Sequence, residues 1–132
     1  MAKAKKVKQL SFTMPNRAGL LSEVSATVSG AKVNIDTICA YEMGDNAYFM
    51  LTTDGNARAR KALAQLGVEA NEEDIVAVEI PNKIGELQKV AKKIADAGIN
   101  INYVYGTTGI GKSSICVFKT SDNTKAIIVI NN

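Results

Sequence analysis

The sequence contains no histidine among its 132 residues. Histidine is the commonest general base in enzymes and a frequent metal ligand, so Cys–His and Ser–His–Asp nucleophile systems cannot be built from this chain. Carboxylates and lysines remain, but no cluster of them stands out by spacing. The sequence therefore predicts a protein that is not an enzyme, has no catalytic residues and binds neither a cofactor nor a metal.

Cysteine and long apolar runs are also scarce. The two cysteines, Cys39 and Cys116, lie far apart in strand-like segments and form no metal-binding or redox spacing. Buried thiols in a reducing compartment are the expected state. No apolar stretch approaches the ~20 residues of a membrane-spanning helix, and the start lacks the apolar core of a secretion signal. These features predict a cytoplasmic protein with no membrane partner.

Positive charge is in small excess, since the formal net charge is +3. Much of it comes from four lysines near the start, at positions 3, 5, 6 and 8. Such a run is usually a solvated, frayed end rather than a nucleic-acid arm. We expect a flexible basic tail at residues 1–6.

One stretch, GTTGIGKS at residues 106–113, matches the phosphate-binding pattern G-x-x-x-x-G-K-S letter for letter. A phosphate loop joins a strand to a helix, so that helical N–H groups face the phosphates. Here the following residues, Ser114-Ile115-Cys116-Val117-Phe118, read as a strand. The sequence therefore predicts a glycine-rich hairpin turn with Lys112 exposed, and not a nucleotide site.

The most informative feature is an internal repeat. Shifting the chain by 66 positions places residues 15–35 on 81–101, and eight of these 21 positions are identical without a gap. The stretch 106–113 then falls on AYEMGDNA, which also reads as strand, turn and strand. We divide the chain into a first module at 1–71 and a second at 72–132, which lacks a clear last strand.

Two ferredoxin-like α+β modules of order β-α-β-β-α-β are predicted in tandem, the second shortened at its C-terminus, each with an antiparallel sheet and both helices on one face. Strands are expected at 7–14, 33–41 and 47–53, and at 75–80 and 99–105, with room for a short strand at 68–70. Helical stripes are expected at Leu21, Val24 and Val28 and at Leu87, Val90 and Ile94. For residues 125–130 the repeat favours a helix and the β-branched run favours a strand; we favour the helix.

The candidate binding site is the pair of loops between the first strand and first helix of each module, PNRAG at 15–19 and PNKIG at 81–85. Early helical N–H groups have no intrahelical partner and suit a carboxylate. Asn16 and Asn82 are either helix caps or ligand contacts, and Asn34 and Asn100 are either turn residues or ligand contacts. In a β-α-β unit we expect the loop and the start of the next strand to come close together.

The segments MPNRAGLLSEV with AKVNIDTI, and IPNKIGELQKV with AGININYV, resemble the ACT domain, a regulatory module that binds amino acids. The resemblance covers nearly the whole chain and occurs twice. It implies a small effector, mostly an amino acid, held between paired modules, and a metabolic enzyme as a partner; free sheet edges favour a homodimer. Serine-sensing members tend to carry a histidine two positions before the loop asparagine, where Met14 and Ile80 stand here.

Together the residues and the resemblance give a set of expected ligand contacts. Loop N–H groups would receive the carboxylate, asparagines the polar remainder, and Asp36 or Glu86 the ammonium. The set comprises Asn16, Arg17, Ala18, Gly19, Leu20, Asn34 and Asp36 in the first copy, and Asn82, Lys83, Ile84, Gly85, Glu86 and Asn100 in the second. The competing interpretation is a ferredoxin-like nucleic-acid-binding module, disfavoured by the modest charge and the missing aromatic motif of RNA-recognition domains.

Overall fold

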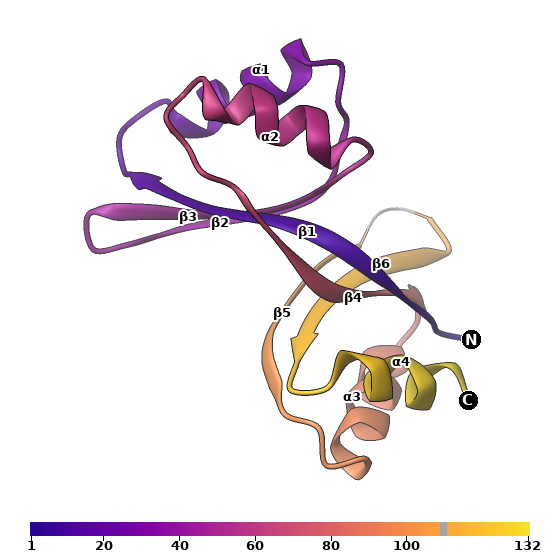
Figure 1. Ribbon diagram of the computed structural model, residues 1–132. Coiled ribbons are helices and arrows are strands. Elements are labelled where there is room, and N and C mark those ends of the chain that lie inside the picture. The colour runs from indigo at the N-terminus through magenta and orange to yellow at the C-terminus, as the bar shows by residue number, and fades with distance from the viewer. Residues whose placement is uncertain (109–110) are drawn as a thin grey trace. The chain divides into compact units, whose positions relative to one another are not determined.

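The computed structural model describes residues 1–108 and 111–132, and the predicted order of helices and strands is confirmed (Figure 1). The elements in chain order are β1 (Lys3–Pro15), α1 (Leu20–Gly30), β2 (Ile35–Met43), β3 (Asn46–Thr53), α2 (Asn56–Ala64), β4 (Asn71–Pro81), α3 (Glu86–Asp96), β5 (Ile101–Thr108), β6 (Ser113–Thr120) and α4 (Asn123–Asn131).

The chain forms two compact units, and two of its strands contribute to both. The first unit comprises Lys8–Glu73, and the second comprises Met1–Val7 together with Asp74–Asn132. The strand order is β2-β3-β1-β4-β6-β5, so β1 and β4 each carry residues of both units. The ferredoxin-like α+β class is thereby confirmed, with a second module that is shortened at its C-terminal end.

In the first unit, β3 pairs antiparallel with both β1 and β2, with Phe12 opposite Phe49 and Ala40 opposite Phe49. Helices α1 and α2 lie together over one face of these strands (Figure 1). Alternation along the strands directs every second side chain toward the helices. The buried core includes Leu10, Phe12, Phe49, Leu51, Val24, Val28 and Leu63.

The second unit repeats this arrangement. Strand β6 pairs antiparallel with β4 and β5, with Val78 opposite Cys116 and Gly106 opposite Cys116. Helices α3 and α4 pack on one face, and α3 ends where Gly98 adopts φ 72°. A residue of positive φ after a helix is the common glycine-type helix end. The core includes Val76, Val78, Ile80, Val90, Ile94, Phe118, Ala126 and Ile130.

The expected flexible tail at residues 1–6 is wrong, because β1 already begins at Lys3. Ala4 is buried in the core of the second unit. Its N–H donates to Asn131 Oδ1 at 2.7 Å, and its carbonyl accepts from Asn131 Nδ2 at 2.9 Å. The two chain ends therefore lie side by side (Figure 1). Lysines alternating with small apolar residues formed a strand with one solvated face, which the count of charges alone could not reveal.

Two uncertain segments are settled by the structure. Residues 68–70 form no strand; Val68 and Ala70 are instead buried in the first core, and β4 begins one residue later. Residues 123–131 form α4, which confirms the favoured helix. Its start is capped by Asp122, whose side chain accepts from the Lys125 N–H at 3.0 Å. Among the described helices, none is long and apolar enough to cross a membrane.

The first member of each predicted helical stripe is wrong. Leu21 is 56% exposed and Leu87 is 52% exposed, whereas Leu20 is buried. The remaining members of the two stripes are buried as predicted. The helix therefore presents Leu20, not Leu21, to the first core, and Glu86 stands at the matching place in α3.

Candidate functional site

The two strand-to-helix loops have the same backbone geometry. Gly19 and Gly85 both adopt φ 84°, a left-handed conformation that glycine tolerates and other residues rarely adopt. Each precedes its helix without any side-chain cap, in contrast to the Asp122 cap of α4. Within the described part of the chain, the N–H groups of Ala18, Gly19, Ile84 and Gly85 donate to no acceptor. The N–H of Glu86 donates to the Lys83 carbonyl at 3.3 Å.

The loop asparagines fasten each loop to the neighbouring hairpin. The Asn16 N–H donates to the Asp45 carbonyl at 2.8 Å, and the Asn82 N–H donates to the Lys112 carbonyl at 2.9 Å. The Asn16 side chain donates to Glu42 Oε2 at 2.5 Å, and the Asn82 side chain approaches the Gly111 carbonyl at 3.4 Å. Neither side chain caps its helix, so the capping interpretation is wrong.

In each unit the strand-start asparagine lies at the opposite end of the strands from the loop asparagine. The Asn34 N–H donates to Asp54 Oδ1 at 2.8 Å, and its side chain donates to Asp36 Oδ1 at 2.9 Å. The Asn100 N–H donates to Ser121 Oγ at 3.0 Å. Asn16 lies beside Met43, the last residue of β2, whereas Asn34 directly precedes Ile35, the first. These two ends of β2 are eight residue steps apart, so Asn16 and Asn34 are separated by roughly 25 Å at ~3.3 Å per residue. A single module does not bring its two asparagines together, contrary to our expectation.

Arg17 of the first loop and Glu86 at the start of α3 each form an ion pair. Arg17 contacts Glu23 at 2.6 Å, and Lys89 contacts Glu86 at 2.7 Å. The hydrogen bond from Lys89 holds the pKa of Glu86 below its usual value. Exposed pairs of this kind contribute little to stability. Asp36 lies with Asn34 at the start of β2, away from the PNRAG loop, so of the two expected ammonium partners only Glu86 is next to a loop.

The G-x-x-x-x-G-K-S stretch joins two paired strands, as the hairpin interpretation predicted. β5 ends at Thr108 and β6 begins at Ser113, so a strand and not a helix directly follows Lys112. Gly109 and Ile110 of this stretch lie outside the described residues. Lys112 is exposed, and its carbonyl accepts the Asn82 N–H. Through this hydrogen bond the stretch helps to hold the PNKIG loop in place.

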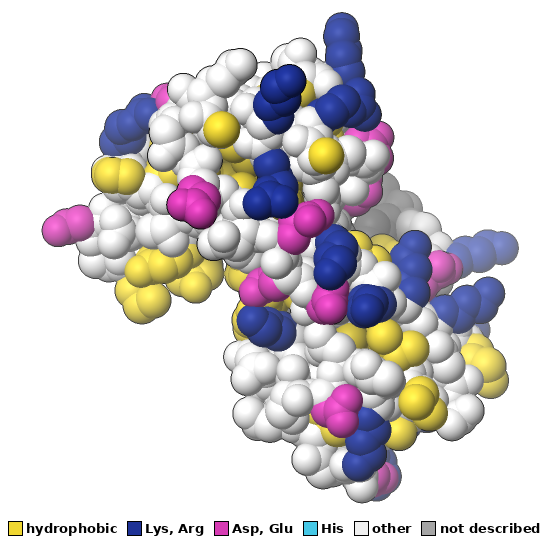
Figure 2. All heavy atoms as spheres, in the orientation of Figure 1, with side chains coloured by type: hydrophobic (Ala, Val, Ile, Leu, Met, Phe, Trp, Pro, Cys, Tyr) yellow, Lys and Arg dark blue, Asp and Glu magenta, His cyan; other side chains and the backbone are white. Residues whose placement is uncertain are grey.

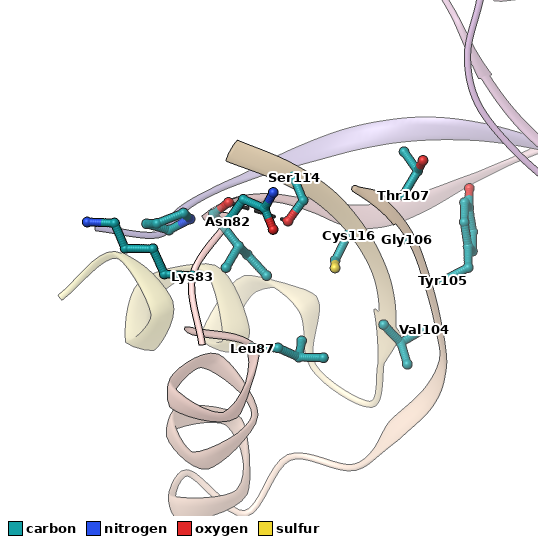
Figure 3. A pocket seen from close by; sticks show the side chains of 11 residues that line it. Asn82, Lys83, Leu87, Val104, Tyr105, Gly106, Thr107, Ser114 and Cys116 are labelled. Atoms are coloured by element: carbon teal, nitrogen blue, oxygen red, sulfur yellow. Dashed lines mark hydrogen bonds between the residues drawn. The ribbon is translucent and has the colours of Figure 1, made fainter. Parts of the chain in front are cut away.

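The second unit has a pocket of about 400 Å³, which we call the α3–β5 pocket (Figure 3). Its lining includes Asn82, Leu87, Val104, Gly106, Ser114 and Cys116. The Cys116 sulfur points toward the space between Leu87 and Val104, whereas the Lys83 and Tyr105 side chains extend away from it (Figure 3). The volume falls in the range of small-molecule sites. Sequence reasoning placed only Asn82 and Lys83 of this lining in the candidate site.

Cys116 is the central residue of this lining. Partial burial raises the pKa of its thiol, so the neutral form persists to higher pH than in a free cysteine. A Cβ added at Gly106 would lie 2.7 Å from the Cys116 sulfur and 3.1 Å from the Ile115 carbonyl oxygen. Gly106 therefore permits the thiol to lie directly over β5.

Charge and aromatic residues give no second site on the described surface. No group of three histidine, cysteine, aspartate or glutamate side chains is placed to hold a metal among the described residues. On the face shown in Figure 2, lysine and arginine side chains are interspersed with acidic ones. Tyr103 and Tyr105 share a sheet face, and their rings stack on each other with centroids 6.4 Å apart.

Comparison with known proteins places this geometry in a family. A search of curated proteins finds no match. Among solved structures, the chain is similar to protein BT0572 from Bacteroides thetaiotaomicron, at 28% identity and a TM-score of 0.88, over 97% of this chain and 88% of that one.

Regulatory subunits share the fold at lower identity. That of aspartate kinase from Thermus thermophilus, in ligand-free form, matches at 15% identity and a TM-score of 0.69, over 98% of this chain and 94% of that one. The regulatory subunit of aspartate kinase from Thermus flavus matches at 19% identity and a TM-score of 0.66, also over 98% of this chain and 94% of that one. A family model described as an ACT domain pair matches residues 5–132. The chain therefore belongs to the ACT domain family and is built as a pair of ACT domains.

Proposed function

We propose that this chain is a regulatory protein without catalytic activity of its own. It binds a free amino acid and regulates a metabolic enzyme in response to that binding. Its membership of the ACT domain family supports a regulatory role. Two solved structures that share its fold are regulatory subunits of aspartate kinase. We further propose that it acts in the cytoplasm as a homodimer, with its outer strands β2 and β5 available for pairing.

The observation that carries the proposal is the repeated, uncapped loop before α1 and α3. Helix N-termini bind anions because their first N–H groups are unpaired and the helix dipole is positive there. In both loops a left-handed glycine precedes the helix, and the N–H groups of the two residues Ala18–Gly19 or Ile84–Gly85 remain open. We assign the ligand carboxylate to these groups, and its polar remainder to the neighbouring Asn16 or Asn82.

The remaining proposed contacts require a second module. Asn34, Asp36 and Asn100 lie at the opposite sheet end from the loop of their own module. A ligand that contacts both a loop and a strand-start asparagine would therefore bridge two modules. A buried amide that loses its partner costs ~1–3 kcal/mol, so we expect Asn34→Ala to weaken such binding by roughly ten- to a hundredfold.

The test is a thermal-shift panel of the twenty amino acids, with ATP and a single-stranded oligonucleotide included, followed by calorimetric titration of the best ligand. We expect one or a few amino acids to bind more tightly than millimolar, and neither ATP nor the oligonucleotide to bind. Sedimentation of the ligand-free and ligand-bound protein would report the proposed dimer. Binding of the oligonucleotide alone would favour a nucleic-acid module instead.

The glycine geometry offers a matched control. Gly85→Ala and Gly98→Ala both place a side chain at positive φ, where an added Cβ meets no neighbour within 4 Å. Each change costs strain of about 1–3 kcal/mol in stability. Only Gly85→Ala, with Gly19→Ala as its counterpart in the first unit, should also weaken amino-acid binding. Equal effects of Gly85→Ala and Gly98→Ala on binding would remove the loop from the site.

A further inference from the structure

The α3–β5 pocket exists because the two copies of the repeat fill the same place differently. In the first unit Phe49 of β3 lies opposite Phe12 and Ala40, and the rings of Phe12 and Phe49 stack with centroids 5.1 Å apart. In the second unit Cys116 of β6 lies opposite Val78 and Gly106. The register makes these two sets equivalent. Two phenyl rings and a methyl group are thus replaced by an isopropyl group, a thiol and a hydrogen.

The space that this exchange leaves is lined mainly by apolar groups. Leu87 in the first turn of α3 and Val104 in β5 face it, and both are about half exposed, at 52% and 49%. Large apolar side chains left half exposed around a pocket lose contact with water when a ligand fills it, which favours an apolar ligand group. Among the described lining residues Lys83 is the only charged one, and its side chain extends away from the space (Figure 3).

The polar end of the pocket is the loop that leads into α3. Asn82 and Lys83 belong to both the pocket lining and this loop, and the open N–H groups of Ile84 and Gly85 follow directly. Ser114 adds a hydroxyl, 3.4 Å from the Ile80 carbonyl oxygen. The α3–β5 pocket is mainly apolar and adjoins the N-terminus of α3, which favours anions. It therefore suits a molecule with a carboxylate at one end and a hydrocarbon group at the other.

We propose that the α3–β5 pocket selects the ligand, and that the second unit binds an α-amino acid with an uncharged aliphatic side chain, such as leucine, isoleucine or valine. This inference rests on the proposed function and adds the class of amino acid and the unit that holds it. In the first unit, the 3% exposed Phe49 stands at the place of Cys116, opposite Ala40. The aromatic class is disfavoured because Tyr105, the aromatic residue of the lining, directs its ring away from the space (Figure 3).

Calorimetric titration of the full chain with leucine, isoleucine, valine, phenylalanine, serine and glycine tests the selection. We expect the best aliphatic amino acid to bind at least tenfold more tightly than glycine and serine, because its side chain leaves water on binding. The double variant Cys116→Phe/Gly106→Ala installs the pair found in the first unit and should weaken aliphatic binding at least tenfold.

A single substitution at an exposed position tests the pocket even if the double variant misfolds. Leu87→Ser changes a half-exposed side chain and should also lower aliphatic affinity, by about tenfold, while Leu21→Ser at the equivalent place of the first unit should leave it unchanged. Alkylation provides a separate readout: bound ligand should slow modification of Cys116 but not of Cys39, the other free cysteine.

The outcomes separate the two proposals. If glycine or serine binds as tightly as leucine, or if Leu87→Ser and Leu21→Ser have equal effects, the pocket does not select the ligand although the regulatory proposal stands. Tighter binding of phenylalanine would overturn the aliphatic assignment. If none of the twenty amino acids binds, the proposed function fails and this inference fails with it.

Discussion

At the residue scale, Leu20 and Leu21 test which face of α1 meets the core. Leu20 is 4% exposed and Leu21 is 56% exposed, although the repeat pattern assigned Leu21 to the apolar stripe. Leu20→Ala should lower the free energy of unfolding by about 2–5 kcal/mol, because it leaves a cavity. Leu21→Ala should change it by less than about 1 kcal/mol. Urea denaturation of both variants measures the difference, and equal losses would contradict the observed rotation of the helix.

Single residues also mark what the sequence could and could not predict about the site. The PNRAG and PNKIG loops were predicted from identical residues at a fixed shift, and both adopt the same left-handed glycine. The pocket was missed because the β5–β6 connection is longer than the β2–β3 turn. The constant shift of 66 therefore no longer aligns β6 with β3. Aligning the strands by their register instead sets Cys116 against Phe49, and that comparison would have indicated the missing volume.

At the element scale, α4 tests how a β-branched segment becomes a helix. Its run Ile127–Ile130 favours extended structure, but Asp122 accepts from the Lys125 N–H, and Ala126 and Ile130 are buried on one face. Asp122→Ala should lower stability by about 0.5–2 kcal/mol. Asp45→Ala, in the exposed β2–β3 turn, is the control and should have little effect. Thermal unfolding of the two variants gives the comparison, and an unchanged midpoint for Asp122→Ala would mean that the cap is dispensable.

The elements themselves were largely predictable because their signals are local: apolar periodicity, a proline at a strand end and turn residues between strands. Strand pairing across the sequence is not local. Asn16 and Asn34 each lie at the predicted junction, yet the length of β2 separates them within one module. Proximity of two junctions depends on which ends of the strands they occupy, and the residues at the junctions do not carry that information.

At the scale of the whole molecule, each unit uses residues from the far part of the chain. Glu73, at the end of the first unit, accepts hydrogen bonds from two side chains of β1, Gln9 Nε2 and Ser11 Oγ, each at 2.9 Å. The first residues of β1 complete the second unit, whose own segment ends with α4. Each unit is also below the size at which a core is comfortably stable alone. Neither half of the sequence therefore specifies a complete unit, and cutting the chain between the repeats should leave two incomplete ones.

The N-terminal strand provides the sharpest test of this exchange. Deletion of residues 1–6 removes Ala4 from the second core together with its two hydrogen bonds to Asn131. Asn131→Ala removes those bonds alone and should cost about 1–3 kcal/mol, whereas Asn132→Ala, at the exposed chain end, should cost little.

Hydrogen exchange locates the effect of that deletion. Protection should fall in α4 and in the Asp74–Pro81 part of β4, because both lose their packing against β1, while β2 and β3 keep theirs. Deletion of Met1 alone, which lies before β1 and is 93% exposed, is the control and should leave both units protected. Uniform loss of protection over the whole chain would show that the units unfold as one body, and unchanged protection would mean that β1 is not needed before Val7.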